Sequence, residues 1–168
     1  MSRITEEIEV GVPVRVAYDQ WTQFESFPQF MDGVDKVSQL NDTTLEWSAT
    51  IAGVKKRWRA RILEQRPDQL IAWQSIDGAT NDGSVRFQPL SSDRTRLALT
   101  LDVAPEGALE KVGDALGLVE RQIKGDLERF RDFIEARRAP TGAWRGGVHD
   151  GEEQVGTATG GTGRAGEG

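Results

Sequence analysis

The chain has 168 residues, a length that predicts one domain, and it is 37% hydrophobic and 29% charged, as is ordinary for a globular protein. It contains no cysteine, which excludes disulfides, thiolate metal sites and cysteine nucleophiles and is consistent with a reducing compartment. No apolar run approaches the roughly 18 residues of a membrane span, and residues 1–7 carry no signal-peptide pattern. We therefore expect a cytoplasmic protein.

The net charge of −6 argues against a general nucleic-acid role, because such domains are usually basic. The single histidine, His149, lies near the C-terminus, so residues 1–138 have no imidazole for a catalytic triad, a zinc site or a proton shuttle. These absences lead us to expect no metal, no cofactor and no nucleic-acid partner.

The first predicted elements are a strand over residues 4–12 and two short helices. Apolar side chains alternate along one face of this strand, and Glu6 interrupts that face. Pro13 suits the first turn of a helix whose apolar positions end at Trp21. A second short helix is predicted over residues 25–31.

A series of short strands follows, separated by turn residues. One-sided alternation of apolar residues predicts a meander of hairpins with one buried face and one wet face. The predicted strands cover residues 34–40, 45–51, 54–62, 70–76, 84–90 and 95–103.

The last predicted element is a long helix with one apolar stripe. Its remaining positions are charged, as at Lys124, Asp126 and Glu128, which predicts an outer face. A stripe of this length needs a long apolar partner, and the one-sided sheet provides it. The stripe consists of Leu109, Val112, Leu116, Val119, Ile123, Leu127, Phe130 and Ile134.

Residues 139–168 form a glycine-rich tail that holds more than half of the 19 glycines. Such a segment buries too little apolar surface to offset its loss of conformational entropy, so we predict a domain over residues 1–138 and a mostly disordered tail. Disorder is expected over about residues 147–168. The piece 142–145 either docks through Trp144 or forms a solvated linker, and its composition favours the linker.

At this point the sequence resembles the START-like (SRPBCC) superfamily, specifically its polyketide cyclase/dehydrase and coenzyme-Q-binding branch. The resemblance covers about residues 3–138, and its motifs specify the fold better than the activity. It rests on the segments 12–14, 17–18 and Trp21, on 24–31 with Val34, on 58–67, 71–73, Gly78, Gly83 and 87–90, and on 125–130 in the last helix.

The resemblance implies an α+β helix-grip fold, in which a curved antiparallel sheet of about seven strands wraps the C-terminal helix. Two short helices follow the first strand. Members of this superfamily hold lipids, quinones or polyketides in an apolar cavity between the sheet and the helix. Cyclase members fold and dehydrate a reactive poly-β-ketone there.

Flat aromatic side chains on the predicted inner faces suit an aromatic or isoprenoid ligand, through dispersion and stacking. For any single aromatic residue, ordinary core packing is the stronger interpretation. For the set as a whole we favour a partial cavity, because side chains alone do not easily fill a sheet curled around one helix. The predicted cavity residues are Phe24, Phe27, Phe30, Met31, Trp47, Trp58, Trp73, Ser75, Phe87, Leu99, Leu101, Val112, Leu116 and Gly117.

Two other features admit more than one interpretation. Gly113 and Gly117 lie on one side of the last helix and either leave room for a ligand or let the helix approach the sheet closely. Tyr18, Glu6 and Ser75 are the acid–base candidates, and a structural role is the stronger interpretation for each. We assign no catalytic residue.

Alternation places Lys55, Arg57, Arg59 and Arg61 on one strand face. A solvated outer face is the favoured interpretation, whereas a functional one is contact with an acyl carrier protein or a membrane surface. If the register were shifted, the arginines would point inward and hold ligand oxygens.

Three functions follow, in order of preference. The first is binding of a hydrophobic small molecule such as a lipid, a quinone or a polyketide-like compound. The second is a polyketide aromatase/cyclase-dehydrase that acts mainly by holding the chain in a reactive conformation. The third is a non-catalytic interaction or stress module with a collapsed cavity. Polar groups that converge inside the cavity would favour the enzyme.

Overall fold

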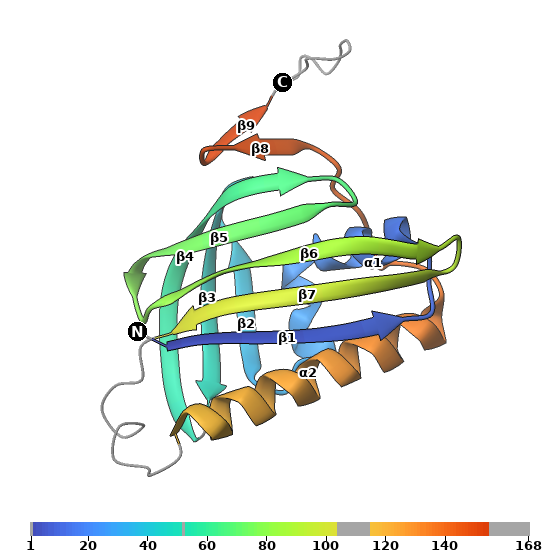
Figure 1. Cartoon of the computed structure of the whole chain (residues 1–168). Coiled ribbons are helices and arrows are strands. Elements are labelled where there is room, and N and C mark those ends of the chain that lie inside the picture. Colours follow the sequence, from blue (N-terminus) through green and yellow to red (C-terminus); the bar gives the residue numbers. More distant parts are fainter. Residues whose placement is uncertain (1, 52, 104–114, 155–168) are drawn as a thin grey trace.

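A curved antiparallel sheet forms the body of the protein, and the computed structural model describes residues 2–51, 53–103 and 115–154 (Figure 1). Neighbouring strands follow the order β1-β7-β6-β5-β4-β3-β2, and a short β8–β9 hairpin adds to β4. The strands are β1 (Ser2–Val10), β2 (Val34–Gln39), β3 (Thr44–Ile51), β4 (Val54–Arg66), β5 (Leu70–Gly78), β6 (Asn81–Ser91), β7 (Arg94–Val103), β8 (Gly147–His149) and β9 (Glu152–Gln154).

The sheet buries one face because its strands alternate in polarity, as in β7, where Leu97, Leu99 and Leu101 are buried between half-exposed residues. The pairing of β4 with β5 shifts register between Arg59 and Ala60 and again between Ile62 and Glu64. Such irregularities bend a strand and increase its twist. The bent sheet therefore has a concave side that can receive a helix.

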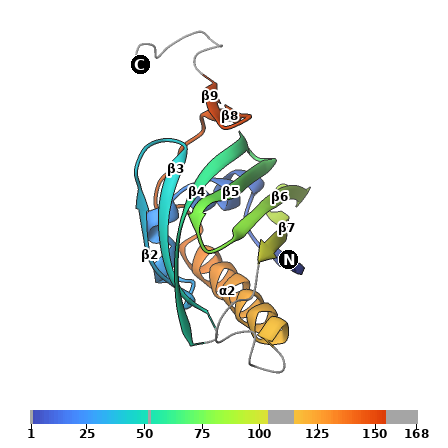
Figure 2. The same cartoon turned by 90° about the vertical axis from the view of Figure 1, so that its left-hand side faces the viewer.

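The helical segments within the described ranges are α1 (Val14–Trp21), the 3-10 helix η1 (Phe24–Gln29) and α2 (Ala115–Arg137). Figure 2 shows α2 lying along the concave side of the sheet. Val119, Leu127, Phe130 and Ile134 of the predicted stripe are buried there, at most 4% exposed. Leu109 and Val112 lie outside the described residues.

Where α2 meets η1 and α1, rings pack edge to face. The Phe130 centroid lies 5.2 Å from that of Trp21 and 5.4 Å from that of Phe30. This closed end of the molecule is solid core. The helix-grip fold predicted from the sequence is confirmed, with β8 and β9 as additions to the seven expected strands. Of the helices in the described ranges, none combines the length and apolarity needed to cross a membrane.

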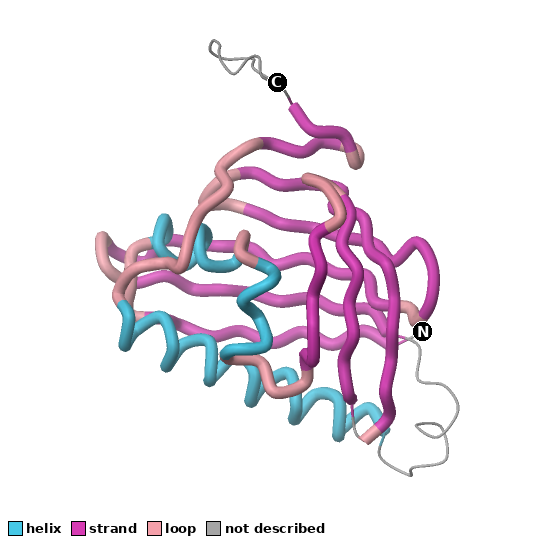
Figure 3. Tube along the Cα trace, turned by 180° about the vertical axis from the view of Figure 1, so that it is seen from behind, coloured by secondary structure: helices cyan, strands magenta, loops and turns pink. Residues whose placement is uncertain are grey.

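Residues 139–154 differ from the predicted disordered tail and lie along the domain, where the β8–β9 hairpin extends the sheet beyond β4 (Figure 3). We call this segment the C-terminal strap. Val148 is 2% exposed and Trp144 packs against the core. The solvated-linker interpretation of 142–145 is therefore wrong, and the expected onset of disorder at 147 is too early. Residues 155–168 lie outside the described ranges.

Polar contacts also hold the C-terminal strap. The Arg145 guanidinium bonds to the Asp19 carboxylate, which is 6% exposed, and lies 2.9 Å from Asp68 Oδ2. Gln20 and Thr141 exchange two hydrogen bonds: the Thr141 backbone N–H donates to Gln20 Oε1 at 2.8 Å, and Gln20 Nε2 donates to Thr141 Oγ1 at 3.1 Å. These partners lie on α1 and on the β4–β5 turn, so the strap connects the two.

Candidate functional site

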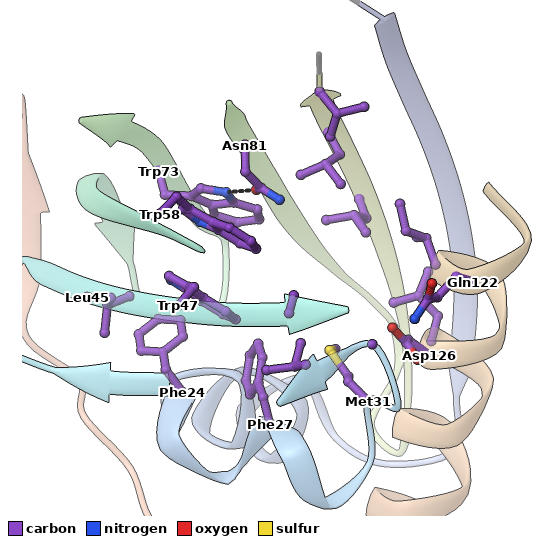
Figure 4. A pocket seen from close by; sticks show the side chains of 18 of the residues that line it. Phe24, Phe27, Met31, Leu45, Trp47, Trp58, Trp73, Asn81, Gln122 and Asp126 are labelled. Atoms are coloured by element: carbon purple, nitrogen blue, oxygen red, sulfur yellow. Dashed lines mark hydrogen bonds between the residues drawn. The ribbon is translucent and has the colours of Figure 1, made fainter. Parts of the chain in front are cut away.

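An apolar cavity of about 130 Å³ lies between the concave face of the sheet, η1 and α2 (Figure 4). Its volume is close to the roughly 150 Å³ of a dry cavity that holds one benzene ring. The lining residues are Trp21, Phe24, Phe27, Met31, Gly33, Val34, Leu45, Trp47, Ala49, Trp58, Ile62, Ile71, Trp73, Asn81, Leu99, Leu101, Val103, Val119, Gln122, Ile123, Asp126 and Leu127.

Most of the cavity residues predicted from the sequence are among these lining residues. The structure brings together Phe24, Phe27, Met31, Trp47, Trp58, Trp73, Leu99 and Leu101 around the space. Met31 lies just after η1, and the others come from inward positions of η1, β3, β4, β5 and β7. The register pairs Trp47 with Trp58 directly across β3 and β4.

Two predicted aromatic residues belong to the core instead of the cavity wall. The Phe30 ring packs against Phe130 at 5.4 Å and against Phe133 at 4.8 Å between centroids. Phe87 meets Tyr18 edge to face at 5.3 Å. Both rings point into the closed end of the fold, where α1 and the end of α2 occupy the space.

The other predicted positions also lie elsewhere. Ser75 closes the β5–β6 hairpin, because its hydroxyl donates to Asp82 Oδ1 at 2.8 Å and accepts from the Asn81 backbone N–H at 3.2 Å. Gly117 is half-buried near the start of α2 and is not among the lining residues. Leu116 begins the same helix, but its side chain lies outside the described part, as do Val112 and Gly113.

One wall of the cavity is aromatic. Trp47 and Trp58 stack with a centroid distance of 5.8 Å and an interplanar angle of 5°, and Phe27 meets Trp47 edge to face at 5.6 Å. The Trp73 indole N–H donates to Asn81 Oδ1 at 3.0 Å. The indole N–H groups of Trp47 and Trp58 find no partner among the residues that the structure describes. This wall presents ring faces and edges, which suit a flat ligand.

The opposite end of the cavity is polar, because Gln122 and Asp126 stand one turn apart on α2 (Figure 4). Gln122 Nε2 donates to the Thr50 carbonyl oxygen at 3.1 Å. Asp126 accepts a hydrogen bond from Arg129, whose guanidinium also lies 3.6 Å from Asp32 Oδ2. Both cavity-lining residues are thereby held by neighbours outside the cavity.

Burial raises the pKa of the Asp126 carboxyl, although the Arg129 guanidinium and the backbone N–H groups of Asp32 and Gly33 oppose this shift. Asp126 is the one ionisable group among the described residues of the cavity wall. A carboxyl with a raised pKa that lines an apolar space can exchange a proton with a ligand. One carboxylate beside amides does not form a metal site.

The charge pattern of the last helix predicted Asp126 on the outer face, and this prediction is wrong, because Asp126 lines the cavity. Asp126 directly precedes the stripe residue Leu127 and follows Ile123 by three positions, so it borders the buried stripe. Helical spacing therefore contained a signal for an inward carboxylate, but the spacing alone does not give the rotation of the helix against the sheet. Gln122 was missed for the same reason, and Asn81, the first residue of β6, was missed because a turn residue was predicted there.

The acid–base candidates predicted from the sequence do not reach the cavity. Tyr18 is fully buried in the core, under the Arg145 guanidinium at 5.5 Å from its ring centroid, and burial raises the pKa of its hydroxyl. Glu6 is half-buried on β1, where it pairs with Leu99, and does not line the cavity. Their positions are those of structural residues.

The basic strand face points away from the cavity. Arg57 and Arg59 lie 3.7 and 3.9 Å from the Glu46 carboxylate, and Arg61 donates to the Gly151 carbonyl oxygen at 2.9 Å. The alternate positions on β4 point inward, and there Trp58 lies between Arg57 and Arg59 and Ile62 follows Arg61. The inward-arginine alternative is therefore wrong. A carrier-protein or membrane contact through Lys55 and these arginines stays a prediction.

Gly33 brings the polar end of the cavity close to β2. An added Cβ at Gly33 would lie 2.3 Å from Gln122 Nε2, at the end of a flexible side chain, whereas at Gly83 it would lie 2.5 Å from the Thr100 carbonyl oxygen of the backbone. We expect Gly33→Ala to cost less than about 1 kcal/mol of unfolding free energy and Gly83→Ala about 1–3 kcal/mol. Urea unfolding measures both, and equal losses would contradict this explanation.

The comparisons with known proteins agree with this geometry. Residues 10–131 match the family described as polyketide cyclase / dehydrase and lipid transport. The chain belongs to this family. An uncharacterized 17.2 kDa protein of Streptomyces lincolnensis is 52% identical to this chain over 149 residues. The aligned region covers 88% of this chain and 99% of the relative.

Solved structures that resemble this member of the polyketide cyclase/dehydrase family share its fold. The Zhui aromatase/cyclase of a Streptomyces species superposes with a TM-score of 0.71 at 19% identity, covering 85% of this chain and 99% of the other. A START superfamily protein from Mycobacterium smegmatis gives 0.62 at 19% identity, with coverage of 80% and 95%. At these identities the likeness establishes the architecture alone.

Proposed function

We propose that the cavity binds a small hydrophobic molecule with a flat, ring-sized portion, of the lipid, quinone or polyketide-like kind. The observation that carries the proposal is an apolar space of about 130 Å³ with stacked tryptophans on one side and a carboxyl on the other. The flat portion would lie against Trp47 and Trp58, and a hydroxyl or carbonyl group would point at Asp126. A larger ligand would need the cavity to widen or would extend out of it.

A second candidate function is a cyclase/dehydrase reaction on a polyketide-like chain. The position of Asp126 on the cavity wall favours it, since a carboxyl with a raised pKa in an apolar space can exchange a proton with a ligand carbonyl. The family description and the aromatase/cyclase fold of the Zhui protein support the same reaction class. The apolar walls would contribute by holding the chain folded.

Ligand binding can be tested by quenching of tryptophan fluorescence with 1-naphthol and with naphthalene, after native mass spectrometry for co-purifying molecules. Ala49 is 3% exposed and lines the cavity, so Ala49→Leu is expected to fill part of the space and weaken binding at least tenfold. Ser48→Leu adds similar bulk to the opposite face of β3 and is expected to leave affinity unchanged.

The ligand proposal fails if neither compound quenches fluorescence and repeated preparations carry no small molecule. It also fails if Ala49→Leu and Ser48→Leu bind alike while both unfold at the wild-type urea midpoint. Binding of 1-naphthol more tightly than naphthalene, with the difference removed in Asp126→Asn, would place the ligand hydroxyl at the polar end.

A further inference from the structure

The single histidine of the chain lies at the end of β8, against β4. The turn that follows it, Asp150–Gly151, has positive φ at both residues, 53° and 78°, as the tight turns of two-residue hairpins require. The hairpin therefore sets the position of Asp150 next to His149. Glu64, from β4, faces both residues across the strap.

Two carboxylates flank the two ring nitrogens of His149. Nδ1 lies 2.9 Å from Glu64 Oε2, and Nε2 lies 3.4 Å from Asp150 Oδ2. The Asp150 backbone N–H donates to Glu64 Oε2 at 3.2 Å, which holds the three residues together. One ligand atom from each residue lies within 4.8 Å of the other two.

In the imidazole tautomer protonated at Nδ1, the N–H is on the side of Glu64 Oε2 and the lone pair of Nε2 is on the side of Asp150 Oδ2. Nε2 and Oδ2 are then two acceptors, 3.4 Å apart, that one metal ion can bridge. Histidine ligands of metals usually donate their other N–H to a carboxylate, and Glu64 Oε2, 2.9 Å from Nδ1, is placed for this role. Ligand atoms around tetrahedral zinc lie about 3.4 Å apart, matching the Nε2–Oδ2 separation.

We propose that His149 Nε2 and Asp150 bind a divalent transition-metal ion of the Zn²⁺ class, with Glu64 orienting the imidazole. Imidazole suits Zn²⁺, Ni²⁺ and Cu²⁺, whereas Mg²⁺ takes oxygen ligands. His149 and Glu64 are 61% and 18% exposed, so the ion would reach the site from solvent and keep water as further ligands. The bound ion would connect the C-terminal strap to β4 and stabilise the folded state by mass action.

The test is calorimetric titration of the untagged full chain with ZnCl₂ at pH 7.5, alongside MgCl₂. We expect one zinc site, no magnesium binding and a rise in the thermal midpoint with zinc. His149→Gln is expected to abolish both zinc effects, and Glu64→Gln to weaken zinc binding about 10–100-fold. Asp42→Asn, at an exposed turn outside this cluster, is the control and is expected to bind zinc like the wild type.

Zinc binding that is equal in the wild type and in His149→Gln would overturn the proposal. So would the absence of any zinc effect on a folded wild-type chain. Retained 1-naphthol binding in His149→Gln would separate this site from the cavity, because the metal site does not depend on the ligand proposal.

Discussion

A chain that ends at Arg138 is expected to lose about 3–5 kcal/mol of unfolding free energy relative to the full chain, although the family resemblance ends at about that residue. Truncation exposes the surface under Val148, which is 2% exposed, and under Trp144. It also removes Arg145 from Asp19, which is 6% exposed, and leaves a buried carboxylate with only the exposed Arg15, 3.7 Å away. Urea unfolding followed by tryptophan fluorescence measures the loss.

Two further variants make this prediction specific to the C-terminal strap. A chain that ends at Gln154 keeps the strap and is expected to stay within about 0.5 kcal/mol of the full chain, since residues 155–168 carry little apolar surface. Arg145→Met keeps an apolar stem but leaves Asp19 and Asp68 without their shared cation, and an intermediate loss is expected. Equal stability of the chains that end at 138 and at 154 would show that the strap contributes nothing.

Asp126→Asn is expected to raise the unfolding free energy at pH 7, by about 0.5–2 kcal/mol, while it impairs the cavity. Burial holds the pKa of Asp126 above its ordinary value of 3.8. At pH values between the ordinary pKa and the higher folded-state pKa, the folded protein keeps a proton that the unfolded chain has released. The unfolding free energy therefore falls as the pH rises through this window. The penalty is complete above the folded-state pKa, and the neutral asparagine does not carry it.

The stability difference between Asp126→Asn and wild type should therefore grow as the pH rises from about 3.8 and then level off. Thermal unfolding at several pH values measures it. Asp132→Asn, an exposed change on the same helix, is the control. On a polyketide-like substrate that is cyclised in this cavity, Asp126→Asn is expected to lower the rate about 10²–10⁴-fold. A destabilised Asp126→Asn at pH 7 would show that the ion pair with Arg129 outweighs the cost of burial.

Much of the cavity wall could be predicted from the sequence because faces of strands follow from alternation alone. Trp47, Trp58 and Leu101 lie inward whichever strands adjoin them, since side chains repeat with a period of two residues. The amphipathic stripe of α2 likewise required a one-sided sheet as its partner. Local periodicity therefore determined the architecture and the apolar character of the site.

Other features depended on contacts between residues far apart in the chain. Phe30 and Phe87 have the same local pattern as the cavity aromatics, but α1 and the end of α2 fill the space at their end of the sheet. Whether Asp126 faces water or the cavity depends on the rotation of α2 about its axis, which a residue at the border of a stripe does not reveal. The C-terminal strap is glycine-rich and lacks periodicity, and its order comes from partners such as Asp19, 126 residues away from Arg145. Composition predicts the entropy that a segment loses on ordering, whereas only the tertiary structure shows the contacts that offset this loss.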